Sequence, residues 1–126
     1  MKLDFDCIRD FLFKAEEMID ITDNYLTSAV KLSEIISDLP QYSPQDIYYT
    51  AIKLEEAKFI TIYRESGLRR APNDFAITDI TYEGHRYINA VRDNSIWKKV
   101  KSAAKSLTLT VAQQAAERLL LQEMGI

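Results

Sequence analysis

The stretch from residue 43 to residue 80 constrains the fold most, because its pattern changes there from helical to extended. Ser43 can cap a helix, Pro44 suits the first helical position, and Asp46 places a carboxylate in the first turn. Residues 59–63 and 75–80 are rich in β-branched and aromatic side chains, which predicts two strands. Between the cap and the first strand, four apolar residues are spaced for one buried helix face: Ile47, Ala51, Leu54 and Ala57.

A shorter helix is predicted before this one. Residues 29–39 carry apolar side chains at helical spacing, and Pro40 ends the pattern. A short helix, a tight turn and a longer helix form a helix-turn-helix pattern, and two strands joined by a loop directly after it form a wing. We therefore predict a mainly α protein with a two-stranded β-wing (α+β), a winged helix-turn-helix with a C-terminal helical extension.

Helices are also predicted on both sides of this unit. The first is capped by Asp4 and buries Phe5, Ile8, Leu12, Ala15 and Ile19, while Phe13 lies off that face without an evident partner in the chain. Thr81 caps another helix. Gly84 inside it costs on the order of 1 kcal/mol relative to alanine, which indicates close approach of a neighbouring element. Further helices begin at 93 or 94 and at about 110. We expect a winged-helix core at 1–93 and an extension at 94–126 packed on it, in one domain.

Composition narrows the class of protein. A chain of 126 residues with three glycines and three prolines suits one domain of long helices and short connections. The net charge of −3 gives no overall attraction to phosphate backbones. A single cysteine excludes an intramolecular disulfide and suits a reducing compartment. With no signal-peptide core and no apolar run long enough to span a bilayer, we expect a cytoplasmic protein without membrane contact.

Two stretches resemble a known family. One is the opening at residues 1–10, Met-Lys-Leu-Asp-Phe-Asp followed by Ile-Arg-Asp. The other is residues 80–88, Ile-Thr-Tyr-Glu-Gly-His-Arg-Tyr-Ile, followed by Val-Arg-Asp and Trp-Lys-Lys. Together they resemble a small uncharacterised family associated with phages and prophages, the domain of unknown function 2513. The resemblance implies a winged-helix fold and a phage context, and it carries no activity.

Catalysis finds little support in the sequence. His85 is the only histidine, and no serine or cysteine has an evident base beside it. His85 also lacks cysteine or histidine companions at metal-ligand spacing, and no glycine-rich phosphate loop is present. We expect no enzyme activity, no cofactor and no metal site. His85 is then a structural or exposed residue at a helix start, and Cys7 an inert core thiol.

The outward face of the helix that begins after Ser43 suggests a function. A helix that enters the DNA major groove normally offers cationic and amide donors, whereas tyrosine and apolar anchors are typical of protein contacts. We predict a partner-binding face for an unidentified protein, in an adaptor or an inhibitor of a host or phage factor, composed of Tyr48, Tyr49, Ile52, Glu55 and Glu56. The alternative is that other parts of the chain, such as residues 21–29 or the C-terminal helices, cover this face.

Basic residues support a second hypothesis, a DNA-binding transcriptional regulator. Arginines gather at the wing, and lysines form a stripe on a C-terminal helix that could meet phosphates or simply face solvent. The candidate nucleic-acid residues are Lys53, Arg64, Arg69, Arg70, Lys98, Lys101 and Lys105. In the last helix, small side chains permit close helix approach, so a homodimer through the C-terminal helices is a further hypothesis: Ala112, Ala115 and Ala116.

Overall fold

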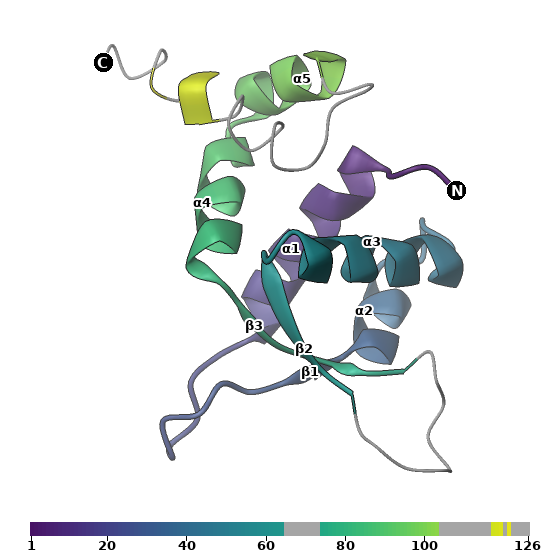
Figure 1. Ribbon diagram of the computed structural model, residues 1–126, viewed down its shortest axis with the longest axis vertical. Helices are drawn as coiled ribbons and strands as arrows, with labels where there is room; N and C mark the ends of the chain where they lie inside the picture. Colours follow the sequence, from purple (N-terminus) through teal and green to yellow (C-terminus); the bar gives the residue numbers. More distant parts are fainter. Residues whose placement is uncertain (65–73, 104–116, 120, 122–126) are drawn as a thin grey trace.

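The computed structural model describes residues 1–64, 74–103, 117–119 and 121. These ranges contain five helices of seven residues or more and three strands (Figure 1). The class of fold is confirmed as α+β, mainly helical with a small antiparallel sheet. In chain order the elements are α1 Phe5–Met18, β1 Val30–Lys31, α2 Leu32–Asp38, α3 Pro44–Glu56, β2 Ile60–Tyr63, β3 Ala76–Ile80, α4 Tyr82–Val91 and α5 Asn94–Ala103.

The sheet has the order β1-β3-β2, with both pairs antiparallel. The predicted hairpin of β2 and β3 is present, with Ile60 opposite Ile80. The helix predicted at 29–39 is wrong at its start, because residues 30–31 form β1. Val30 lies opposite Ile77 in the sheet, and the Leu32 amide donates to the Phe75 carbonyl (2.9 Å). The backbone amides and carbonyls of residues 30–31 thus pair with β3, so they are not available for the hydrogen bonds of a longer helix.

Polar side chains define where the helices begin. The Ser43 hydroxyl accepts from the Asp46 amide (3.1 Å), and the Thr81 hydroxyl accepts from the Gly84 amide (3.1 Å). The Asp4 carboxylate caps α1 in the same way, and the Asp93 carboxylate accepts from the first-turn amides of α5. Each bond satisfies an amide that has no partner within its helix. The predicted helix starts at Asp4, Ser43, Thr81 and Asp93 are therefore confirmed.

The core lies between the sheet and the helices that pack around α1. Ile8, Leu12 and Ala15 of the predicted α1 face are buried, and Phe5 and Ile19 are half-buried against the core. The prediction that Phe13 lacks a partner is wrong. Its ring is half-buried, with the Arg9 guanidinium 4.8 Å and the Arg92 guanidinium 6.0 Å from the ring centre. Two cationic side chains therefore cover Phe13 from within the chain.

Gly84 permits the close approach that the sequence predicts. A Cβ on Gly84 would meet the carbonyl oxygen of Phe59 and lie 2.7 Å from Ile80 Cγ2. The same region is fastened by Thr81, whose hydroxyl donates to the Lys58 carbonyl (2.6 Å). The absence of a side chain at Gly84 thus lets α4 pack directly on the turn between α3 and β2.

Helix α5 joins the same core through Ile96, Trp97 and Val100, which are buried. Residues 104–116 lie outside the described ranges. They include Ala104, Leu107 and most of the helix predicted from about residue 110, with Ala112, Ala115 and Ala116. Among the helices that are described, none has the length and apolar character needed to cross a membrane. The buried side chains of α5 thus belong to the same hydrophobic cluster as those of the other helices.

Candidate protein-contact surface

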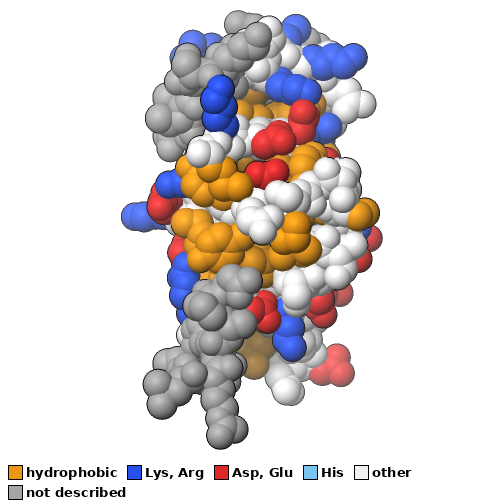
Figure 2. Space-filling view, turned by 90° about the vertical axis from the view of Figure 1, so that its right-hand side faces the viewer, with side chains coloured by type: hydrophobic (Ala, Val, Ile, Leu, Met, Phe, Trp, Pro, Cys, Tyr) orange, Lys and Arg blue, Asp and Glu red, His pale blue; other side chains and the backbone are white. Residues whose placement is uncertain are grey.

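Helices α2 and α3 form an apolar groove on one face of the protein. The groove encloses about 370 Å³, and apart from the Gln45 amide its lining is hydrocarbon, thioether and aromatic: Met1, Leu32, Ile36, Pro44, Gln45, Tyr48 and Tyr49. Figure 2 shows hydrophobic side chains gathered in the middle of the face on which these two helices lie. Exposed apolar surface of this kind is typical of sites where another molecule binds.

Part of the predicted partner-binding face packs within the chain. Tyr48 is half-buried against Phe75, with ring centres 5.8 Å apart, and Ile52 is half-buried against the core. Tyr49 lines the groove and has the Lys53 ammonium 5.3 Å from its ring centre. Residues 19–21 and Thr27 lie instead beside β3 and α4, where they line another cleft. The Tyr48 ring is therefore covered by Phe75, the residue before β3, and not by residues 19–21 or Thr27.

The charges predicted for two opposing functions pair with each other. The Arg64 guanidinium donates to both carboxylate oxygens of Glu55 (3.2 Å each), and the Lys53 ammonium donates to Glu56 (3.0 Å). Arg64 also lies 5.3 Å from the ring centre of Phe75. Pairs this exposed contribute little to stability, but they leave α3 with balanced charge along this face. Neither an arginine–phosphate contact nor a free acidic patch is favoured there.

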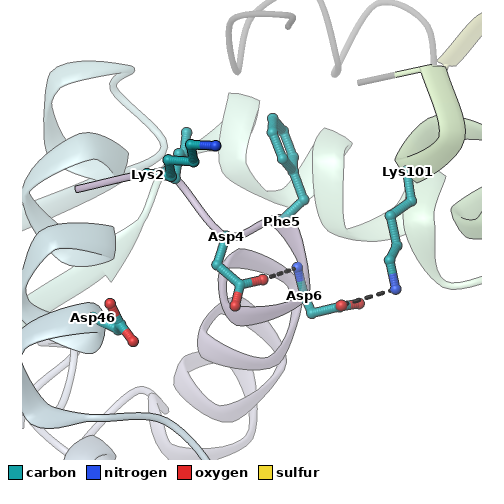
Figure 3. A pocket seen from close by; sticks show the side chains of 7 residues that line it. Lys2, Asp4, Phe5, Asp6, Asp46 and Lys101 are labelled. Atoms are coloured by element: carbon teal, nitrogen blue, oxygen red, sulfur yellow. Dashed lines mark hydrogen bonds and ion pairs between the residues drawn. The ribbon is translucent and has the colours of Figure 1, made fainter. Parts of the chain in front are cut away.

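The basic residues of the second hypothesis are only partly described. Lys98 is exposed on α5, whereas the Lys101 ammonium pairs with the Asp6 carboxylate (2.8 Å). This pair lies at a surface cavity of about 560 Å³, lined also by Asp4 and Asp46 (Figure 3). The cavity carries three carboxylates against the two ammonium groups of Lys2 and Lys101, which disfavours a phosphate at this position. The remaining candidates fall outside the described residues: Arg69, Arg70 and Lys105.

His85 is exposed near the start of α4, with its Nδ1 3.9 Å from a Glu16 carboxylate oxygen. It lines a cleft of about 230 Å³ together with Glu16, Asp20 and Asp79. Within the described ranges no three histidine, cysteine or acidic side chains are arranged to hold a metal ion. The surface cleft around His85 thus combines carboxylates and the Thr27 hydroxyl with isoleucine side chains.

Cys7 is buried in the core, where the Thr50 hydroxyl donates to its sulfur (3.3 Å). Burial raises the pKa of the Cys7 thiol from 9.0 to about 11, so the thiol stays protonated in the folded chain at pH 8.

We expect thiol reagents at pH 8 to label Cys7 at least about tenfold faster in denaturant than in buffer. Because the pKa is raised, unfolding also becomes easier as the pH rises from 9 toward 11. Equal labelling rates in both conditions would show that Cys7 is accessible.

The chain is thus a small α+β protein with an apolar groove between α2 and α3 and paired charges on α3. The chain belongs to the family of hypothetical proteins DUF2513, whose model matches residues 2–110. No curated protein and no solved structure matches the chain. Tyr48 and Tyr49, two residues of the predicted partner-binding face, line this groove, whereas its other wall, Leu32 and Ile36, was not predicted. The helical spacing of Leu32 and Ile36 predicts that they share a face, but it does not show that this face lies beside Tyr49.

Proposed function

We propose that this chain is a non-catalytic winged-helix protein of phage type that acts by protein–protein interaction, as an adaptor or an inhibitor of a host or phage factor. The winged-helix assignment is supported by the order helix, strand, helix, helix, strand, strand and by the sheet order β1-β3-β2. In this arrangement α2 and α3 are the helix-turn-helix and the β2–β3 hairpin is the wing. The phage context is supported by the family resemblance.

The groove between α2 and α3 carries the proposal. A DNA-reading helix needs several donors directed outward, whereas this groove offers the Gln45 amide among two tyrosines, a proline, a methionine and aliphatic side chains. Aromatic side chains in apolar clefts are the residues that most often dominate protein interfaces. Both tyrosines line the groove, and Tyr49 is the better suited to such a contact, because the Tyr48 ring also packs on Phe75. The partner is accordingly a protein that presents an apolar anchor.

Affinity capture from host lysate, with and without nuclease, tests this function. We expect a protein to be captured in equal amount after nuclease treatment. Tyr49→Ala should weaken capture by roughly 30-fold, as loss of an interface anchor of about 2 kcal/mol does. Tyr82→Ala is the matched control, because Tyr82 is an exposed tyrosine on α4. Capture that depends on nucleic acid, or that Tyr49→Ala leaves unchanged, contradicts the proposal.

The second candidate is a DNA-binding regulator, favoured by the same element order, because winged helices of this kind often bind duplex DNA. This candidate predicts binding to duplex DNA that weakens steeply as salt rises and weakens further in Arg69→Ala with Arg70→Ala. Arg64, Lys53 and Lys101 are paired with carboxylates. We therefore expect no gel shift with mixed-sequence duplexes even at a low salt concentration of about 50 mM. A salt-sensitive shift would favour the DNA-binding function.

A further inference from the structure

Residues 20–28, between α1 and β1, form a hydrogen-bonded hairpin. Ile21 and Thr27 lie opposite each other in an antiparallel bridge. The Thr22 amide donates to the Leu26 carbonyl (2.7 Å), and the Ser28 amide donates to the Asp20 carbonyl (2.8 Å). In Figure 1 the hairpin is the loop at the lower left, between the end of α1 and β1. Its tip is therefore a defined structure that extends from the body of the protein.

The hairpin presents large apolar side chains to solvent. Ile21, Tyr25 and Leu26 are 59%, 88% and 66% exposed. Side chains this exposed contribute almost nothing to the core, since stability comes from apolar area removed from water. All three lie within six residues of one hairpin, and exposed apolar side chains gathered in this way mark contacts with other molecules.

The backbone at Tyr25 supports the same conclusion. Its φ of 61° lies in the left-handed region, which asparagine or glycine adopts at lower cost than tyrosine. Local conformation therefore favours another residue, and the tyrosine side chain makes no compensating burial in the fold. The side chain of Tyr25 is better explained by a contact outside the chain.

The charge around the tip indicates the chemistry of the partner. Residues 20–28 contain Asp20 and Asp23 and no lysine or arginine. The cleft beneath the hairpin, about 230 Å³, is lined by the carboxylates of Asp20 and Asp79 beside isoleucine side chains. Glu16 and His85 line it as well, and the Glu16 carboxylate is paired with Arg92. Carboxylates repel phosphate backbones and anionic membranes, whereas they attract lysine and arginine. A cationic side chain with an apolar stem fits this cleft.

We propose that the hairpin is a second protein-contact surface, which binds a cationic amphipathic helix of a partner protein. Leucine-type side chains of that helix pack on Tyr25, Leu26 and Ile21, and an arginine or lysine enters the cleft beside Asp20 and Asp79. The surface is separate from the groove of α2 and α3, with which it shares no lining residue. The chain would then contact two protein surfaces.

The test uses a synthetic helical peptide of leucines and arginines as the probe, followed by NMR titration of the full chain. We expect the largest amide shifts at residues 20–28 and at Asp79. Tyr25→Asn with Leu26→Ser should weaken binding at least tenfold, and Asp20→Asn about fivefold. Tyr82→Asn and Asp38→Asn are matched controls that remove an exposed tyrosine and an exposed acid elsewhere, and both should bind as the parent chain does. Tyr25→Asn alone should raise Tm by roughly a few degrees.

Three outcomes would overturn the inference. Equal affinity for the same peptide with glutamate in place of arginine would remove the charge argument. Shifts centred on residues 44–52 would assign the peptide to the groove instead. Under the inference the peptide binds at the hairpin, so Tyr49→Ala should retain full peptide binding. Sedimentation of the chain with phosphatidylcholine or phosphatidylserine vesicles, lost in Tyr25→Asn with Leu26→Ser, would assign the tip to a membrane.

Discussion

Gly84→Val should lower the free energy of unfolding by about 3 kcal/mol. The first added carbon would collide with the Phe59 carbonyl oxygen and with Ile80 Cγ2. A backbone carbonyl cannot rotate away as a side chain does, so α4 must move from the turn between α3 and β2. Gly84→Ala has the same first contact and should cost about 2 kcal/mol, in spite of the better helix propensity of alanine.

Urea unfolding of both variants gives these values, and Tyr82→Ala serves as the control. Tyr82 lies two residues earlier on α4 and is 78% exposed, so its replacement should change the free energy of unfolding by no more than about 0.5 kcal/mol. A Gly84→Ala variant more stable than the parent chain would show that α4 does not pack this closely.

Arg9→Ala should lower the free energy of unfolding by about 2–3 kcal/mol. Arg9 joins α1 to the junction of α4 and α5, where its guanidinium donates to the carbonyls of Val91 (2.9 Å) and Arg92 (3.2 Å) and to Asn94 Oδ1 (3.0 Å). The same group lies 5.4 Å from the ring centre of Trp97. Removing it leaves polar groups of the junction without a partner and uncovers two aromatic rings.

The emission of Trp97, the single tryptophan, reports this loss directly. Because Trp97 is buried, Arg9→Ala should shift its emission to longer wavelength before global unfolding. Arg9→Lys should not restore the parent value, since an ammonium cannot reproduce the fork of guanidinium donors. Arg86→Ala, which removes exposed pairs with Glu83 and Glu117, should leave emission unchanged. Unchanged Trp97 emission in Arg9→Ala would show that Arg9 does not hold α5 at this junction.

Local signals made most of the helices predictable. Ser43, Pro44 and Asp46 form a helix start that depends only on neighbours in sequence, and Gly84 on an apolar helix face already required a close neighbour. Strand β1 could not be predicted in this way, because Val30 is held by Ile77, far along the chain. Phe13 was missed for another reason. Its cover is the charged residue Arg9 one turn earlier, and apolar spacing does not count guanidinium groups as partners.

The candidate surface was predictable in chemistry but not in shape. Tyrosines and carboxylates on α3 follow from helical spacing alone. The groove requires α2 to lie beside Tyr49, and the pairing of Arg64 with Glu55 requires the chain to turn back after α3. Lys58 allows that turn with a φ of 64°, although no glycine marks it. Contacts between different helices and strands therefore decide which of the predicted residues remain available to a partner, and such contacts cannot be read from the spacing within one helix.

Hydrogen–deuterium exchange tests the contact groove most directly. Exchange is measured for the full chain alone and with the protein recovered by affinity capture. A partner seated between α2 and α3 predicts slower exchange at residues 32–36 and 44–52, with α5 unchanged. Slower exchange confined to α5 and to the residues around Arg64, with the groove unchanged, would contradict the proposed contact surface.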